Sequence, residues 1–128
     1  MPEPLRVLVV DDEEDVQILF TQRFRREIRS GKVELRFALS GETALDTLRR
    51  GAAADVVFVL SDINMPGMTG IELLAAIKEE FPDLRVVMVT AYDDATLRAR
   101  ALAHGAEGYY TKPIDFDELK QEVFGLTA

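Results

Sequence analysis

Five short runs of apolar, largely β-branched residues alternate along the chain with longer segments of helical periodicity. The strand-like runs are Leu5–Val10, Val33–Leu39, Val56–Leu60, Leu84–Val89 and Gly108–Thr111. This alternation predicts an α/β fold, in which a parallel sheet is covered by helices on both faces. Because crossovers between parallel strands are right-handed, few windings are available. We expect a doubly wound (βα)5 sandwich with a five-stranded parallel sheet in the order 2-1-3-4-5.

The segments between these runs carry helix signals. Ser40 and either Asp93 or Asp94 are expected to cap the first turns of two helices. Thr69 and Glu72 fit a capping box at the start of another helix. Apolar residues at helical spacing are expected to face the sheet. They are Val16, Leu19, Phe20, Phe24 and Ile28 in the first helix, then Ala44, Leu45 and Leu48, then Ile71, Leu74, Ala75 and Ile77, and in the last helix Phe116, Leu119 and Val123. A further helix runs through Leu97 and Leu102 and ends at Gly105.

Length and composition favour one compact domain over residues 1–128, without a linker or an internal repeat. The absence of cysteine excludes disulfides and thiolate metal sites, and a single histidine excludes a multi-histidine metal cluster. Apolar runs are far shorter than the roughly 20 residues of a membrane span, and the first residues do not resemble a secretion signal. We therefore expect a cytoplasmic protein without membrane contact.

The net charge of −8 argues against direct binding of nucleic acid, which requires clustered basic residues. Basic residues are mostly dispersed among acids, apart from short runs such as Arg23-Phe-Arg-Arg. An acidic chain can bind cations or basic partner surfaces, or its excess charge can serve solubility alone.

Polar residues follow the expected strands at their carboxyl ends. Asp11 and Asp12 follow the first strand, Asp62 the third, Thr90 the fourth and Lys112 the fifth. In doubly wound sheets, ligands bind beyond these strand ends, near the point where strand order reverses. Three carboxylates, one hydroxyl and one ammonium are therefore expected to converge there.

Clustered carboxylates repel one another, and a divalent cation removes that repulsion. Oxygen ligands with room for water favour Mg²⁺. A carboxylate such as Asp62 can attack phosphorus to give an aspartyl phosphate, with positive charge from Mg²⁺ and Lys112 stabilising the transition state. The alternative is that residues 11–15 form an acidic helix start and that Asp62 is a turn residue. That alternative explains Glu13–Asp15 but not two acids directly at the end of a buried strand.

Four motifs make the chain resemble the receiver domains of bacterial response regulators in two-component signalling, including the single-domain chemotaxis type. The resemblance covers essentially the whole chain and implies a flavodoxin-like sandwich. Its motifs are Val-Val-Asp11-Asp12-Glu, Ser-Asp62-Ile-Asn-Met-Pro66-Gly-Met-Thr-Gly70, Val-Thr90-Ala91 and Tyr109-Tyr-Thr-Lys112-Pro113.

The resemblance implies that Asp62 takes a phosphoryl group from the phosphohistidine of a histidine kinase. Asp12 and Asp62 would ligate Mg²⁺ directly, together with the backbone carbonyl of Asn64, while Asp11 acts largely through water. Lys112 would pair with Asp62 and then with the phosphoryl group. On this reading the chain is not an enzyme for other substrates and catalyses only its own phosphorylation and slow autodephosphorylation.

The resemblance also implies a switch. Thr90 and Ala91 would move towards the phosphoryl group, and the ring of Tyr109 would rotate inward behind them, whereas Tyr110 would belong to the packing. The rearranged face would comprise roughly residues 95–124, the fourth helix, fifth strand and fifth helix of the pattern.

Expected partners are a sensor histidine kinase or a phosphotransfer protein, and a downstream protein or an output domain outside this chain. Leu97, Ala101 and Phe116 are candidates either for the core or for a partner surface, including that of a homodimer formed on phosphorylation.

Two local expectations come from the family pattern: a cis peptide between Lys112 and Pro113, and an influence of Asn64 and Tyr92 on hydrolysis. The bulk of Tyr92 predicts a persistent aspartyl phosphate. The stretch Arg25–Lys32 is longer than is usual in the family and does not touch the matched site residues.

Three rival functions remain. A metal-dependent phosphatase would need a second aspartate where this chain has Asn64, and a cap domain. A flavin-binding electron carrier would need a loop rich in Ser, Thr and Gly after the first strand, where five acids stand instead. A degenerate receiver would act as a binding module without phosphorylation.

Overall fold

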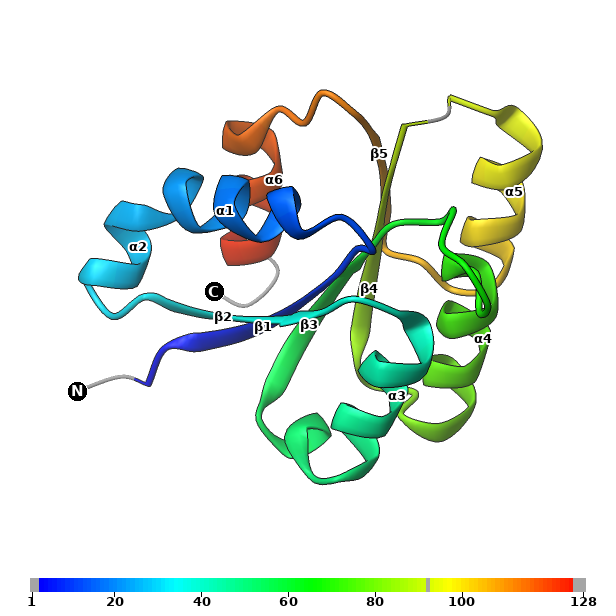
Figure 1. Cartoon of the computed structure of the whole chain (residues 1–128), viewed down its shortest axis with the longest axis horizontal. Coiled ribbons are helices and arrows are strands. Elements are labelled where there is room, and N and C mark those ends of the chain that lie inside the picture. Colours follow the sequence, from blue (N-terminus) through cyan, green and yellow to red (C-terminus); the bar gives the residue numbers. More distant parts are fainter. Residues whose placement is uncertain (1–2, 92, 126–128) are drawn as a thin grey trace.

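The computed structural model describes residues 3–91 and 93–125, which form a parallel sheet between two layers of helices (Figure 1). The strands are β1 (Leu5–Val10), β2 (Val33–Ala38), β3 (Val56–Ser61), β4 (Arg85–Thr90) and β5 (Gly108–Thr111). They pair in the order β2-β1-β3-β4-β5, so the predicted α/β fold and strand order are confirmed. The helices are α1 (Glu14–Arg23), α2 (Arg25–Arg29), α3 (Gly41–Arg49), α4 (Gly70–Glu80), α5 (Ala95–Ala103) and α6 (Phe116–Gly125), with a 3-10 turn at Ala52–Ala54.

Three helices begin at the predicted caps. Ser40 Oγ accepts a hydrogen bond from the Thr43 amide at 3.0 Å and thereby caps α3. Thr69 and Glu72 form the complete capping box of α4. Of the two candidates for α5, Asp94 is the cap. Each cap satisfies backbone amides that have no partner within the helix, which is why the chain enters the helix at that residue.

The first helix is not continuous, so the prediction of one helix through Ile28 is wrong. It divides at Phe24 into α1 and α2. The side chain of Lys120, from α6, donates a hydrogen bond to the backbone oxygen of Arg23 at 2.7 Å. Phe24 is buried against Phe20 and Phe116. The break therefore lies where an ammonium group satisfies a carbonyl of the last turn while an aromatic ring anchors the chain.

The core has two halves, one on each face of the sheet. Helices α1 and α6 cover one face over Val7, Val9 and Phe58, and α3, α4 and α5 cover the other over Leu8 and Val59. Central strands are thus buried on both faces, which explains their continuous apolar sequence.

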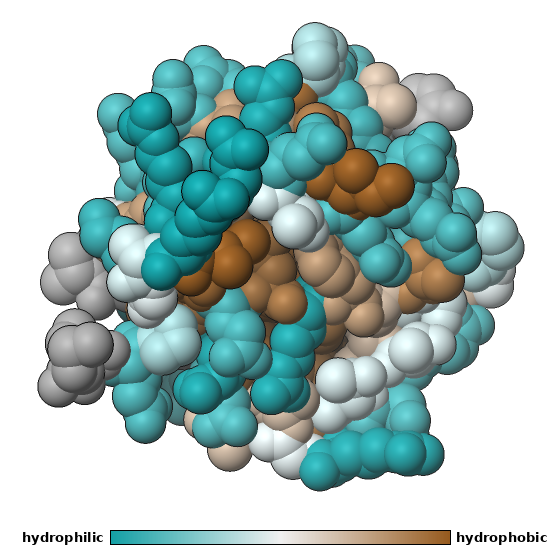
Figure 2. All heavy atoms as spheres, turned by 60° about the vertical axis from the view of Figure 1, so that its left-hand side comes forward, coloured by the Kyte–Doolittle hydropathy of each residue, from teal (hydrophilic) through white to brown (hydrophobic). Residues whose placement is uncertain are grey.

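Two residues expected to point inward do not, since Leu19 and Ile28 are among the exposed large hydrophobic residues. Ala101 is fully buried in the core, which excludes it from an accessible partner surface. Hydrophobic residues remain visible between hydrophilic ones on the face that Figure 2 turns forward. Among the residues described, no helix combines the length and apolar character that crossing a bilayer would require.

Candidate functional site

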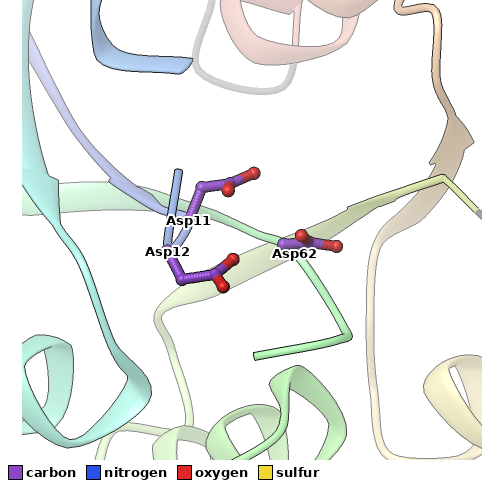
Figure 3. A group of neighbouring side chains, drawn as sticks. All are labelled: Asp11, Asp12 and Asp62. Carbon is purple, nitrogen blue, oxygen red and sulfur yellow. The ribbon is translucent and has the colours of Figure 1, made fainter. Parts of the chain in front are cut away.

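Two aspartates are held at the ends of neighbouring central strands by a continuation of the sheet's hydrogen bonding. The amide of Asp11 donates to the oxygen of Ala38 at 3.1 Å, and that of Asp62 donates to the oxygen of Val10 at 2.9 Å. Because β1 and β3 are adjacent, Asp11, Asp12 and Asp62 lie together beyond the strand ends (Figure 3). The predicted convergence of the three acids is confirmed.

The three carboxylates can share one cation. Each offers an oxygen, and these oxygens lie within 4.8 Å of one another. Oxygens on opposite sides of one Mg²⁺ are about 4.2 Å apart, given bond lengths near 2.1 Å, so a small side-chain rotation is enough. Asp11 and Asp62 are 6% and 9% exposed, whereas Asp12 faces solvent. The donor set therefore consists of hard oxygens with an open side for water, which fits Mg²⁺.

Lys112 supplies the positive charge opposite these acids. Its Nζ lies 3.0 Å from Asp11 Oδ2 and 3.8 Å from Asp62 Oδ2. The nearer partner is thus Asp11, where the family resemblance suggested Asp62. The amide of Lys112 donates to the oxygen of Thr90 at 2.8 Å, which fixes it beside the end of β4. The predicted cis peptide between Lys112 and Pro113 is confirmed.

Burial and the neighbouring charges shift the pKa of Asp62 in directions that partly cancel. Burial raises the pKa of Asp62, and the negative charges of Asp11 and Asp12 add to it, while Lys112 and a hydrogen bond from the Ile63 amide oppose it; on balance the pKa is raised. Burial alone would lower the pKa of Lys112, but its hydrogen bond to Asp11 and the charge of Asp62 raise it overall. Lys112 therefore keeps its charge, whereas the carboxyl group of Asp62 ionises less readily than that of an exposed aspartate.

The other predicted site residues are close in the fold but differ in exposure. Thr90 is completely buried at the end of β4, and Ala91, directly after it, is exposed. Asn64 is exposed on the loop after β3, and its role as a carbonyl ligand remains a prediction. Tyr109 is 8% exposed, with the Arg98 guanidinium carbon 4.7 Å from its ring centroid. Tyr92 lies outside the described residues, and so does the expectation built on it.

One residue that supports the site carried no assigned role in the sequence. The amide of Gly70 donates to the oxygen of Ile63 at 2.8 Å, and a Cβ at position 70 would lie 2.8 Å from the Ile63 Cα and closer still to the backbone oxygen of Asp62. Only glycine lets the start of α4 approach the Asp62 backbone so closely. The signals in the sequence are that Gly70 ends the motif containing Asp62 and that it directly follows the cap Thr69, where most residues are tolerated.

A model of the response regulator receiver domain family matches residues 7–124. The chain belongs to this family. As a receiver domain, it is part of a two-component signalling system, and receiver domains bind Mg²⁺ through acidic residues such as the cluster described above. Receiver domains interact with kinases and phosphotransfer proteins.

Relatives of this receiver domain differ in overall length. It is 31% identical over 118 residues to sporulation initiation phosphotransferase F of Bacillus subtilis, covering 92% of this chain and 90% of the relative. It is 37% identical over 112 residues to the DNA-binding transcriptional regulator NtrC of Proteus hauseri, covering 88% of this chain but only 22% of that protein. The receiver domain thus spans about a fifth of the length of that regulator.

A solved structure with the same fold is a chain of the CheX–CheY–BeF3–Mg²⁺ complex from Borrelia burgdorferi. The TM-score is 0.86 at 30% identity, with 98% of this receiver domain and 91% of that chain covered. The flavodoxin-like fold expected from the sequence is therefore that of chemotaxis-type receivers.

Proposed function

We propose that Asp62 of this chain accepts a phosphoryl group from the phosphohistidine of a sensor histidine kinase or phosphotransfer protein. The observation that carries the proposal is the meeting of Asp11, Asp12 and Asp62 with the ammonium of Lys112. Supporting it, the chain is similar to a protein named as a phosphotransferase and to a receiver bound to BeF3 and Mg²⁺.

The metal would be held by Asp12 and Asp62 directly, by the backbone carbonyl of Asn64, and by Asp11 largely through water. Bound Mg²⁺ supplies positive charge for the phosphoryl oxygens and for the carboxylate cluster. This charge also offsets the burial that raises the pKa of Asp62, so that its carboxylate is ionised when it attacks.

In the reaction, a carboxylate oxygen of Asp62 forms a bond to phosphorus while the bond from phosphorus to the donor imidazole nitrogen breaks. The electron pair of that bond stays on the imidazole. Lys112, with its Nζ 3.8 Å from Asp62 Oδ2, contacts a phosphoryl oxygen as charge develops. Thr90, buried beside it, donates its hydroxyl to another phosphoryl oxygen after transfer. The domain catalyses only this step and the slow hydrolysis of its own aspartyl phosphate.

The phosphoryl group adds a charge of about −1.5 to −2 and biases the surface formed by α5, β5 and α6 between two arrangements. Thr90 and Ala91 approach the new group, and Tyr109 adjusts behind them. The altered face controls a downstream protein or an output domain, or forms a homodimer. Leu97 and Phe116, which are partly buried, remain candidates for that contact, whereas Ala101 does not.

The test is phosphorylation by acetyl phosphate, with and without Mg²⁺, read by intact mass. We expect one phosphoryl group per chain with Mg²⁺, none with Asp62→Asn, and normal loading of the exposed control Asp83→Asn. Beryllofluoride should perturb NMR resonances of residues in α5 and β5 only when Mg²⁺ is present.

Loading of Asp62→Asn to the same extent would exclude Asp62 as the acceptor. Failure of the wild-type protein to load or to bind beryllofluoride would favour the degenerate binding module. Turnover of a free phosphomonoester would indicate a phosphatase, and a yellow purified protein would indicate a flavin carrier.

A further inference from the structure

Positive charge is concentrated in one segment of an otherwise acidic chain. Residues 23–36 contain six basic and two acidic residues, a net charge of +4, whereas the whole chain carries −8, so the remaining residues carry −12. The basic residues are Arg23, Arg25, Arg26, Arg29, Lys32 and Arg36. We call this surface the α2 patch. It comprises α2, the loop from α2 to β2, and a neighbouring groove that is lined by Ile28, Leu35 and Phe37.

Charges in the α2 patch are largely uncompensated. Arg25, Arg26 and Arg29 are exposed, and among residues 3–91 and 93–125 none of the three forms an ion pair. The nearby acids are engaged elsewhere. Glu27 lies 3.2 Å from Lys120, and Glu34 is bridged by Arg6 at 3.7 Å and Arg36 at 3.5 Å.

An apolar groove of about 450 Å³ lies between α1, α2 and β2. Ile28, which lines it, belongs to the same short helix as the exposed Arg25, Arg26 and Arg29. Glu34 also lines the groove, and its charge is paired with Arg6 and Arg36. Ile28 stands on one wall, and Leu35 and Phe37 lie on the β2 side. The groove stays open for two reasons. The chain breaks at Phe24, which ends α1 early, and β2 is the edge strand of the sheet. Figure 2, which turns this side forward, shows hydrophobic residues recessed between strongly hydrophilic ones.

We propose that the α2 patch binds an acidic segment of a partner protein that also carries apolar side chains. The apolar side chains would enter the groove over Leu35 and Phe37, and the carboxylates would pair with Arg25, Arg26 and Arg29. Charge complementarity selects this occupant, because an apolar groove next to a helix with three exposed arginines matches alternating acidic and apolar groups. Nucleic acid offers no apolar side chains for the groove, and the remaining −12 charge repels an extended polyanion. A flat bilayer cannot reach the floor of a groove.

The α2 patch lies away from the phosphoacceptor site. The loop after α2 leads into the start of β2, where the Leu5 amide donates to the Lys32 oxygen at 2.9 Å. Asp62 stands beyond the opposite, carboxyl end of the parallel strands. The two sites therefore lie at opposite ends of the sheet.

The probe is a fluorescein-labelled peptide of about twelve residues in which Glu and Asp alternate with Leu and Val, followed by fluorescence anisotropy. We expect binding to the full chain that weakens about tenfold in the double variant Arg25→Glu, Arg29→Glu. The matched control is Arg50→Glu, Arg100→Glu, which changes net charge equally at exposed sites elsewhere and should bind like wild type. Asp62→Asn should also bind like wild type, and circular dichroism should show that every variant is folded.

A peptide with serine in place of its apolar residues tests the groove, and its binding should be at least about tenfold weaker. Absence of peptide binding to the wild-type chain would overturn the proposal. Equal weakening by both double variants would also overturn it, since the effect would then be one of net charge. Tighter binding of single-stranded DNA or of phosphatidylserine vesicles would assign the patch to those ligands instead. Self-association of the peptide-free chain that is lost in Arg25→Glu, Arg29→Glu would assign it to a second copy.

Discussion

Gly70 shows how the absence of one carbon atom can position a functional site. The start of α4 lies directly against the backbone of residues 62–63, and a Cβ at position 70 would overlap it. The capping box at Thr69 and Glu72 fixes the helix, so the helix cannot retreat without losing its cap. Any added side chain must therefore displace the loop that carries Asp62.

We expect Gly70→Ala to lower the free energy of unfolding by about 3 kcal/mol and to weaken Mg²⁺ binding by about tenfold. The matched control is Gly125→Ala, where the added carbon would lie within 4 Å of no described residue beyond its neighbours in the chain and helix, and stability should hardly change. Urea denaturation and Mg²⁺ titration followed by NMR check both values. Unchanged Mg²⁺ affinity in a folded Gly70→Ala variant would show that the close approach does not position the site.

The raised pKa of Asp62 makes the metal-free protein sensitive to pH. The folded state holds the Asp62 proton more tightly than the unfolded state, so this group favours folding at low pH. Its favourable contribution is lost as pH rises through the raised folded pKa. Because asparagine does not ionise, Asp62→Asn should remove this loss of stability at higher pH.

In chelator, we expect the Tm of Asp62→Asn to exceed that of wild type by about 4 °C at pH 7, with the difference shrinking towards about pH 4. Added Mg²⁺ should stabilise the wild type more than the variant. Calorimetry at several pH values measures this, with Asp83→Asn as the exposed control. A wild-type protein that is more stable than Asp62→Asn in chelator at pH 7 would contradict the prediction.

At the scale of elements, α6 holds the junction between α1 and α2. The ammonium of Lys120 reaches the oxygen of Arg23, lies 3.2 Å from Glu27, and sits 5.2 Å from the ring centroid of Phe24. Burial alone would raise the pKa of Glu27, but a backbone hydrogen bond and the ammonium groups of Lys120 and Lys32 lower it overall. The Lys120 side chain thus joins α6 to α1 and α2, although Lys120 and Arg23 are 97 residues apart in the sequence.

We expect Lys120→Met to lower the free energy of unfolding by about 1–2 kcal/mol at neutral pH. The folded state lowers the pKa of Glu27, so the ionised carboxylate stabilises the fold at pH values above its ordinary pKa of 4.5. This stabilisation disappears as the pH falls through the lowered pKa. The loss caused by Lys120→Met should therefore shrink in acid, as urea denaturation at two pH values would show. The exposed substitution Lys32→Met, which leaves the Arg23 carbonyl bonded, should cost less.

How far the sequence predicts these elements depends on the range of the interactions that decide them. Strands and caps such as Ser40 and Asp94 were predictable because they depend on neighbouring residues. The cluster of Asp11 with Asp62 was predictable because parallel strands present their carboxyl ends at one edge. The break at Phe24 was not, since it depends on Lys120, 97 residues from Arg23. Nor was the preference of Lys112 for Asp11, which depends on how three side chains share a small space.

Across the whole molecule, protection from solvent decreases from the centre of the sheet towards its edges. Strand β3 is paired on both sides and covered on both faces, and Phe58 and Val59 are completely buried. In contrast, α2 has five residues, none of them buried. Opening of α2 exposes little apolar surface and leaves the sheet intact.

Native-state hydrogen exchange should reflect this gradient. We expect the amides of Val59 and Val87 to exchange only through global unfolding, and those of Ile28 and Ser30 to exchange with an opening free energy lower by at least about 3 kcal/mol. Lys120→Met should accelerate exchange at Ile28 more than its loss of global stability accounts for. Equal opening free energies for Val59 and Ile28 would show that α2 unfolds only with the sheet.

The arginines of α2 and the aspartates of the candidate site are two clusters of opposite charge at opposite ends of β1 and β2. Strands of six residues separate the guanidinium-rich end from the aspartate-rich end by about 20 Å, more than two Debye lengths at physiological salt. Each cluster therefore attracts partners of the opposite charge with little influence from the other cluster. A protein bound to the arginines of the α2 patch leaves the aspartates exposed at the opposite end of the strands. A phosphoryl donor can then still reach Asp62 while that protein is bound.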